Sequence, residues 1–565
     1  MPLPRTLSAE ETEFLAKTFS PETEPLSHLG TSKSAQRAGS NTIGQDISVC
    51  RAALARIMAI GPSGGNGSGV LLSHSGRTLI ATSSSVWNTP ESARESRVFL
   101  DYESGSCPLE VRLQSDKLFV MDEDLGYVLV ACCEDRLDGR EPVHLMPGQK
   151  IQSGSNVQFW EHEEDGHKRL VSQVVREVAE DHMLCLSEKF ETAGAPGFQE
   201  ADGRMRFVAL QCSYKSTEGL SKSIFADQII LSASVRIPLA EMAAQRTSAS
   251  VQATQCRLLG KLAYETDRNK VAIVNANGVE HICMAMAAHL HDEVVQEEGC
   301  GALINIATGR VDVQAAIANA GGIRLICAAL KAHEKSEIVQ GSGCWALACI
   351  AADSKAGVHA HIAEVGGIER ICHAMRQHKQ NAAVQVAGCR AIANLAATND
   401  PEIQESIAMA GAIEHICGAM QAHLNSAVVQ KRACGALMHI AASNVDAQAL
   451  IARSGGIDRI CTAMAVHSRS EDVQEKGCWA LVCLTGDSST GNHVSIVKAG
   501  GIERICAAMA SHESCSKVQE VGLQCIARLS LLTRPGNTEG KIVTIEGLRD
   551  NGLETVTECG KCAIS

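Results

Sequence analysis

Residues 310–351 read RVDVQAAIANAGGIRLICAALKAHEKSEIVQGSGCWALACIA, and this stretch decides the fold of more than half the chain. A short apolar-periodic run over 311–320 ends at Gly321 and Gly322, which favour a tight turn between helices. Two further runs, from Ile323 to about His333 and from about Ile338 to Ala351, place apolar residues at helical spacing. The stretch therefore predicts three consecutive helices, of which the first is short.

The same pattern recurs along the chain at a nearly constant interval. The dipeptide Val-Gln begins at positions 251, 295, 339, 384, 429, 473 and 518, so the steps are 44 or 45 residues long. A fixed period of this length is the signature of stacked helical repeats. We predict a solenoid over 235–562 with six full repeats and a half-repeat at each end. The first half-repeat contains a helix over 235–246. The last half-repeat consists of two helices, Lys541–Asn551 and Gly552–Cys562.

Cysteine and histidine keep the register of the repeat, in columns that read Cys256, Cys300, Cys344, Cys389, Cys434 and Cys478, then Cys283, Cys327, Cys372, Cys417, Cys461 and Cys506, then His289, His333, His378, His423, His467 and His512. Side chains of one column stand roughly 10 Å apart in stacked helices. This is too far for them to share a metal bound at about 2 Å. We therefore predict no metal site, cysteines that fill the core, and histidines that bond the last carbonyls of their own helices.

Three helices per unit, the first one short, resemble the armadillo repeat, and the Gly-Gly-Ile, Val-Gln and Gly-Cys signatures are similar to the armadillo regions of leucine-rich-repeat kinases. The resemblance implies a right-handed superhelix whose third helices line a concave groove for a protein or extended peptide. Armadillo proteins that carry nuclear cargo place a Trp and an Asn four residues apart on the third helix. No repeat here has both, so the resemblance does not extend to nuclear import, and no kinase domain accompanies it.

The two columns of the third helix that would face a groove supply the candidate partner-binding residues. Trp and Arg are common anchors in protein interfaces. The basic members favour an acidic segment as the partner; the alternative is that they are solvated side chains on a groove with another use. The candidates are Arg257, Lys261, Asn305, Trp345, Arg390, Asn394, His439, Trp479 and Arg528.

Residues 47–234 have a different character. Short β-rich runs separated by Gly, Ser and Asp turns predict an all-β barrel or sandwich; they lie at Val70–Leu72, Thr78–Thr82, Val98–Leu100, Tyr127–Val130, Asn156–Trp160 and Phe207–Gln211.

Three stretches in this half resemble the trypsin-like serine proteases of the peptidase S1 type, in the right order and with the right gaps. They are Gly67-Ser-Gly-Val-Leu-Leu followed by Leu79-Ile-Ala-Thr-Ser-Ser-Ser-Val86, then Asp124-Leu-Gly-Tyr-Val-Leu-Val130, then Thr192-Ala-Gly-Ala-Pro-Gly-Phe198. The resemblance implies a trypsin-like double β-barrel; an unrelated β domain is the alternative.

The resemblance also shows that the catalytic positions have changed. Ser85 stands at the histidine position, Gly126 at the aspartate position, Ala193 at the nucleophile position, and Glu191 replaces the glycine before it. The chemistry needs a hydroxyl nucleophile and a base that takes its proton; Ala193 has no hydroxyl, and Ser85 cannot act as a base near neutral pH. We predict that the domain is a pseudoprotease and not an enzyme. The alternative is an active endopeptidase with a displaced catalytic set, for which Thr192, Asp124, His74 and His182 are the neighbours considered.

Composition restricts the remaining classes of function. The 565 residues carry a formal net charge of −13 and no long basic run, which argues against nucleic-acid binding. No apolar stretch approaches the length of a membrane span, and the first residues lack a signal-peptide pattern. The 24 cysteines suit a cytoplasmic protein that uses Cys as a small buried residue. No cofactor is expected.

The two ends of the chain carry separate predictions. Residues 1–46 are rich in Ser, Thr, Glu and Gly and are predicted to be a disordered arm. The chain ends Cys562-Ala-Ile-Ser565, with 563–565 expected to be free, and this fits a prenylation box with Cys559 as a second lipid site. A chance match in a cysteine-rich chain is the alternative. We predict a cytoplasmic scaffold or adaptor whose groove binds a protein segment, with the pseudoprotease domain as a second docking surface; membrane association depends on prenylation.

Overall fold

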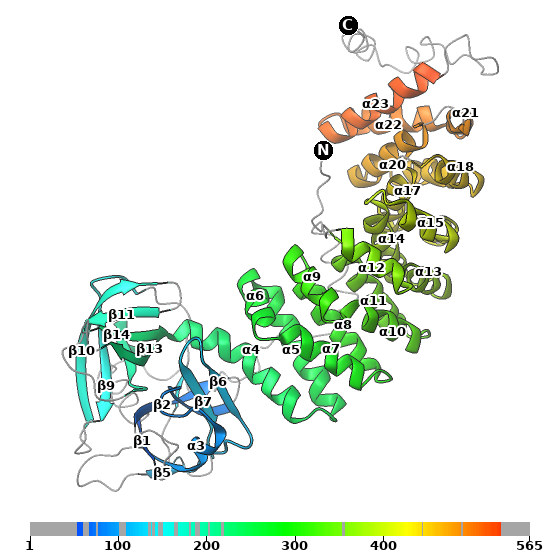
Figure 1. Ribbon diagram of the computed structural model, residues 1–565. Helices are drawn as coiled ribbons and strands as arrows, with labels where there is room; N and C mark the ends of the chain where they lie inside the picture. Colours follow the sequence, from blue (N-terminus) through cyan, green and yellow to red (C-terminus); the bar gives the residue numbers. More distant parts are fainter. Residues whose placement is uncertain are drawn as a thin grey trace, which may run out of the picture. The chain divides into compact units, whose positions relative to one another are not determined.

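The computed structural model describes residues 54–532 apart from the segments 60–66, 75–76, 101–108, 134–136, 138–141, 145–150, 163–167, 180–181, 187–192, 202–203, 216–219, 353–355, 443 and 487–489. The predicted arm over 1–46, the predicted last half-repeat over 541–562, Cys559 and Cys562, and the positions of Glu191 and Thr192 lie outside the described residues. The chain divides into two compact units. One holds the strands with helices α4 (Ala226–Ala244) and α6 (Asp267–Asn275), and the other holds the remaining helices from Ala249 onward (Figure 1).

Short strands form two sheets in the β unit. The first sheet pairs in the order β5-β4-β1-β2-β3-β7-β6 with β8 parallel to β2, and the second closes into a six-stranded barrel in the order β10-β11-β14-β13-β12-β9. The first sheet consists of β1 (Leu54–Ala59), β2 (Gly67–His74), β3 (Arg77–Ser83), β4 (Ser96–Leu100), β5 (Leu109–Val111), β6 (Phe119–Asp122), β7 (Tyr127–Ala131) and β8 (Val143–His144). The barrel consists of β9 (Asn156–His162), β10 (Lys168–Val178), β11 (His182–Leu186), β12 (Pro196–Ala201), β13 (Arg204–Lys215) and β14 (Leu220–Phe225). The predicted β region is therefore confirmed, with one closed barrel in it.

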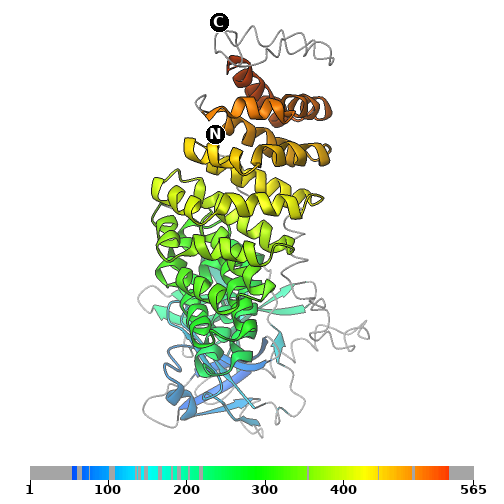
Figure 2. The ribbon, with the colours of Figure 1, turned by 90° about the vertical axis from the view of Figure 1, so that its right-hand side faces the viewer.

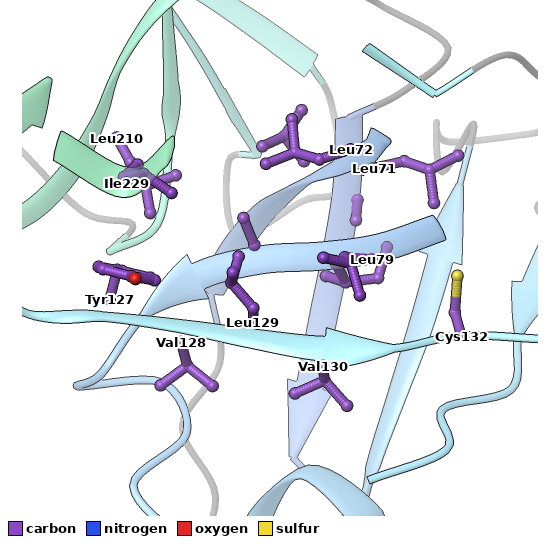
Figure 3. Close-up of a cluster of buried hydrophobic side chains, with 14 of the residues drawn as sticks. Leu71, Leu72, Leu79, Tyr127, Val128, Leu129, Val130, Cys132, Leu210 and Ile229 are labelled. Atoms are coloured by element: carbon purple, nitrogen blue, oxygen red, sulfur yellow. The ribbon is translucent and has the colours of Figure 1, made fainter. Parts of the chain in front are cut away.

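The core of the first sheet forms because its central strands are apolar along their whole length. All five residues of β7 are buried, and Leu71, Leu79 and Leu129 are fully buried. Such a continuous apolar run is typical of a strand covered on both faces. Figure 3 shows these side chains together with Leu210 of β13 and Ile229 of α4, which belong to the same core cluster. The core thus joins the first sheet to the barrel and to α4.

Helix α4 is longer than the predicted helix over 235–246, because it begins at Ala226 directly after β14. A buried carboxylate fixes it to the first sheet: Asp122 of β6, 5% exposed, accepts hydrogen bonds from Arg236 Nε at 2.9 Å and from Ser232 Oγ at 2.5 Å. Arg77 of β3 forms a second ion pair with Glu241 of α4. Burying an ion pair is tolerated when additional hydrogen bonds satisfy the charges, and Ser232 supplies one here.

The helical unit confirms the predicted repeat. Each of the five repeats from Val311 to Leu532 has a short first helix, a second helix and a third helix, and α5, α7 and α8 precede them. The first helices are α9 (Val311–Asn319), α12 (Ala356–Glu364), α15 (Pro401–Met409), α18 (Val445–Arg453) and α21 (Asn492–Lys498). The second helices are α7 (Gly278–Ala288), α10 (Gly322–Ala332), α13 (Gly367–Gln377), α16 (Ala412–Ala422), α19 (Gly456–Val466) and α22 (Gly501–Ser511). The third helices are α5 (Ala249–Glu265), α8 (Glu293–Ala307), α11 (Glu337–Ile350), α14 (Ala382–Ala396), α17 (Ala427–Ala441), α20 (Glu471–Leu484) and α23 (Ser516–Leu532).

The recurrent glutamine of the Val-Gln dipeptide caps the C-terminal end of the second helix. In α14, Gln385 Nε2 donates to the carbonyls of Met375 at 3.0 Å and His378 at 2.9 Å, and the glutamine at the same position in α8, α11, α17, α20 and α23 makes the same two bonds. The last carbonyls of a helix have no partner within it. One buried side-chain amide therefore satisfies two of them in each repeat.

The histidine column was predicted to bond the carbonyls of its own helix, and that prediction is wrong. His378 Nε2 lies 2.8 Å from the carbonyl oxygen of Glu334 in the preceding repeat. His333, His423, His467 and His512 reach the equivalent carbonyl of the repeat before theirs, also at 2.8 Å. A carbonyl only accepts, so Nε2 must carry the hydrogen. The glutamine already occupies the helix end, and the imidazole instead joins consecutive repeats.

The predicted glycine turns have two distinct causes. The first glycine of each pair has a positive φ, 79° at Gly321 and 75° at Gly366, a conformation that costs residues with a Cβ atom. The second glycine has no room: a Cβ on Gly367 would lie 2.6 Å from Ile362 Cγ2 and 2.8 Å from its carbonyl oxygen. Both features allow the first helix to meet the second at a sharp bend.

We expect Gly366→Ala to destabilise the solenoid by about 1 kcal/mol and Gly366→Asn by clearly less, because Asn tolerates the left-handed region. The chain itself contains the precedent, since Asn277 occupies the corresponding position before α7 with φ 59°. Thermal unfolding of the full chain measures the difference. Equal losses for both variants would contradict the role of the positive φ.

Candidate binding face

The predicted binding face lies on the third helices. Neighbouring third helices contact one another far more extensively than neighbouring second helices do, so the third helices form one continuous packed layer of the stack (Figures 1 and 2). Two columns of side chains, four residues apart, define what we call the third-helix face: Arg257, Gly301, Trp345, Arg390, Gly435, Trp479 and Gln524, and Lys261, Asn305, Cys349, Asn394, His439, Cys483 and Arg528.

Three candidate residues of the second column donate hydrogen bonds to backbone carbonyls of this chain. Asn305 Nδ2 donates to the carbonyl of Gly260 at 3.1 Å, Asn394 Nδ2 to that of Ala348 at 2.8 Å, and Arg528 Nη1 to that of Val482 at 3.2 Å. Each acceptor lies on the preceding third helix. These side chains therefore connect consecutive repeats, while Lys261 and His439 of the same column are half-buried.

Several cations of the third helices are paired with carboxylates. Arg257 contacts Glu298 at 2.6 Å, and Lys431 contacts Asp472 at 2.7 Å. Both pairs join a third helix to the next one, and both span 41 residues. The acidic partners Glu298 and Asp472 were not among the residues predicted from the sequence. A search for opposite charges one helical turn short of the 44–45-residue period would have found them.

Trp345 is not the open platform that the sequence suggests. The indole is only 3% exposed, and the guanidinium carbon of Arg390, from the next third helix, lies 4.7 Å from its ring centroid. This is the geometry of a cation–π interaction. Arg390 is itself 7% exposed, and its Nη1 has no hydrogen-bond partner in the described part of the chain.

Trp479 differs from Trp345 although both occupy the same column. It is half-buried, and no cation or ring stacks on it within the described residues. The preceding repeat has Gly435 in this column, and a Cβ there would meet nothing within 4 Å. The indole of Trp479 therefore stands next to open space on the third-helix face.

Ser85, Gly126 and Ala193, the positions that the resemblance assigns to a protease triad, lie near one another in the β unit. Ser84 N donates to the carbonyl of Gly126 at 2.9 Å, which brings the turn after β3 against the turn before β7. The carbonyl of Ala193 accepts from Ser68 N at 3.0 Å. A Cβ on Gly67 would contact both Val86 and that same carbonyl. Ser85, Gly126 and Ala193 thus surround one region, although 108 residues separate the first from the last.

Among the described residues of this region, no hydroxyl or thiol is hydrogen-bonded to a base. Ser83 Oγ donates to the carbonyl of Cys212 at 3.0 Å, so the hydroxyl of the exposed Ser85, 2.9 Å away, donates to Ser83 Oγ. Burial raises the pKa of the Cys212 thiol to about 12. His74 Nε2 contacts Ser234 Oγ of α4 at 3.3 Å, and Asp124 is exposed.

The cysteines behave as core residues. Those of the described segments are free thiols, and nearly all of them are buried. Burial raises the pKa of Cys256, Cys300, Cys327 and Cys372 to about 12. Within the described residues, no group of His, Cys, Asp and Glu side chains could hold a metal ion.

We expect these cysteines to resist alkylation in the folded chain. A thiol with a pKa of about 12 is ionised to about one part in ten thousand at pH 8, and the thiolate is the reactive form. Iodoacetamide at pH 8, followed by peptide mass measurement, should modify the half-buried Cys515 first and the two cysteine columns only after unfolding. Rapid modification of Cys327 in the folded chain would contradict this expectation.

In the described segments no single helix is long and apolar enough to cross a membrane; two bent pairs of helices, α6 with α7 and α9 with α10, reach the required length and composition only together.

The repeated three-helix units, their glycine turns and the layer of third helices define the helical unit as an armadillo-type solenoid. Residues 351–547 match the family model described as the LRRK2 ARM repeat. Among solved structures, an engineered protein of the Northeast Structural Genomics Consortium is 28% identical, with 54% of this chain and 70% of that chain covered and a TM-score of 0.47. A designed armadillo repeat protein in complex with the peptide (KR)4 is 21% identical, with 45% and 99% covered and a TM-score of 0.39. No curated protein matches the chain.

Proposed function

We propose that this chain is a non-enzymatic scaffold that binds a protein or extended peptide segment on its third-helix face. The observation that carries the proposal is Trp479, a half-buried indole without a stacking partner beside the open position of Gly435. A tryptophan side chain that remains partly exposed is a typical interface anchor.

We further propose that the β unit is a trypsin-like domain that has lost its catalytic groups and serves as a second docking surface. The convergence of Ser85, Gly126 and Ala193 around one region supports the resemblance to the protease fold. Within the described residues no base is hydrogen-bonded to the hydroxyl of Ser85 or to the thiol of Cys212, which supports the loss of activity. The proposal includes a cytoplasmic location, with membrane association only if Cys562 is prenylated.

One incubation tests the scaffold function. The immobilised full chain is exposed to a library of twelve-residue peptides, and mass spectrometry identifies the bound peptides and any new peptide ends. We expect intact bound peptides, with at least a tenfold loss of capture by Trp479→Ala, because the indole is the anchor. The matched control is Met409→Ala, which removes a side chain that is 75% exposed on the first helix α15 and lies off the face.

Two results would overturn the proposal. Equal capture by Trp479→Ala and by the unmodified chain would show that the third-helix face is not the binding surface. New peptide ends at a consistent residue type, absent from a heat-denatured control, would show an active endopeptidase instead. The intact mass of the chain purified from eukaryotic cells separately reports whether Cys562 carries a lipid.

A further inference from the structure

Arg390 is an unpaired charge in the middle of the third-helix face. Two other cations of the third helices, Arg257 and Lys431, have carboxylate partners. Arg390 has no carboxylate and no hydrogen bond within the described residues, and it is 93% buried (7% exposed), with its Nη1 fully buried. A buried charged group without a partner is costly. The stack on Trp345 compensates only in part, since the ring offers no hydrogen-bond acceptor.

The surroundings of Arg390 are also positive. Cys349 lies on α11, one helical turn after Trp345, and the two charges that act on its thiol are those of Arg390 and Arg432. Both lower the pKa of this thiol, although burial raises it more strongly. Two guanidinium groups from α14 and α17 therefore act on one spot of the third-helix face, and the flanking position in α8 is Gly301, where a Cβ would meet nothing within 4 Å.

We propose that Arg390, held against Trp345, is the subsite that receives the carboxylate of an aspartate or glutamate side chain from the bound segment. A guanidinium pairs with a planar carboxylate through two parallel hydrogen bonds. The guanidinium lies over the indole, which covers it on one side and accepts no hydrogen bond, so Nη1 is left without an acceptor in the described residues. A shift of the side chain toward the bound carboxylate would supply the acceptor that Nη1, buried in the free chain, lacks. This inference rests on the proposed function, and it adds the chemistry of the partner, an extended acidic segment.

The distance between Arg390 and Trp479 predicts how far apart the two anchoring residues of the bound segment lie. Arg390 and Trp479 are two repeats apart, roughly 20 Å at about 10 Å per stacked helix. An extended chain advances about 3.3 Å per residue, so about six residues span that distance. The preferred segment therefore has an acidic residue about six positions from an apolar one that contacts Trp479.

Two synthetic libraries test the proposal. Both contain twelve-residue peptides randomised at all but the third position, which is Glu in one library and Gln in the other. Capture by the immobilised full chain is measured by mass spectrometry. We expect at least a tenfold preference for the Glu library, with apolar residues enriched about six positions away. This comparison uses the unmodified chain, so it does not depend on the folding of any variant.

Variants locate the preference at Arg390. Arg390→Gln should abolish the difference between the two libraries, and Arg390→Lys should retain only part of it, because a lysine keeps the charge without the planar fork. Arg376→Gln, the same change at an exposed arginine of α13, should leave the preference intact. Equal capture of both libraries by the unmodified chain, lost in Trp479→Ala, would overturn this inference and leave the scaffold function standing. Capture of neither library would overturn both.

Discussion

Gly194→Ala should destabilise the β unit by about 4 kcal/mol, the largest loss that we expect from a single methyl group in this chain. Two effects combine. Gly194 has φ +85°, a conformation that costs a residue with a Cβ about 1–2 kcal/mol. The added Cβ would also lie within the contact radius of the Ser68 carbonyl oxygen and of Thr82 Oγ1, which are hydrogen-bonded to each other at 2.7 Å and cannot both move away.

Hydrogen exchange of the full chain measures this loss unit by unit, because peptides of the β unit and of the solenoid report separately. The matched control is Gly154→Ala. Gly154 has a similar φ of +88°, but a Cβ there would meet nothing within 4 Å. We expect a loss of about 1 kcal/mol for the control. Equal losses at both positions would show that the packing around Gly194 has no part in the effect.

Gln385→Leu should destabilise the solenoid by about 3 kcal/mol. The change removes both donors that satisfy the carbonyls of Met375 and His378 and keeps the side chain close to its original volume. Leaving a buried acceptor without a partner costs about 1–3 kcal/mol. The loss should concentrate where α13 ends and α14 begins.

Peptides that cover α13 and α14 should exchange their amide hydrogens faster in Gln385→Leu than in the unmodified chain, and the thermal midpoint should fall. Gln377→Leu makes the same chemical change at an exposed position of α13, eight residues earlier. It should alter neither quantity measurably. Fast exchange confined to segments remote from α13 and α14 would contradict the capping role of Gln385.

The period of the sequence was sufficient to predict the solenoid. Glycine pairs, buried apolar columns and cysteines recur every 44 or 45 residues, and local rules translate each of them into a turn or a helix face. The hydrogen bonds made by the recurrent polar residues could not be predicted in the same way. The sequence shows only that Gln385 recurs in the Val-Gln dipeptide, because the carbonyls that accept its hydrogen bonds lie at the end of a different helix.

Contacts between repeats explain the errors. The acceptor of His378 lies 44 residues earlier, so the sequence around His378 pointed to its own helix instead. Trp345 was expected to be open because nothing near it in the sequence covers it, and the residue that does, Arg390, lies 45 residues later. Trp479 occupies the same column and remains partly exposed, because the next repeat offers Gln524 in place of an arginine.

In the β unit, the resemblance of three short motifs led us to expect Ser85, Gly126 and Ala193 near one another, and the turns that hold these residues do contact each other. The sequence did not predict the hydrogen bonds beside them. The bond from Ser83 Oγ to the carbonyl of Cys212 depends on β13 approaching the end of β3, a contact across 129 residues. Pairings of that kind follow from the tertiary structure and not from local preference.

The histidine joint has a consequence for how such a chain could have grown. The repeats that contain His333, His378, His423 and His467 carry both halves of the joint: an imidazole that bonds to the preceding repeat, and a carbonyl, one residue after that imidazole, that accepts from the following repeat. A duplicated segment of 44 or 45 residues therefore contains both the imidazole and the carbonyl that bond it to the repeats before and after it. Duplication or deletion of whole repeats could lengthen or shorten the gene product in single genetic events, whereas an insertion of any other length would break the joint.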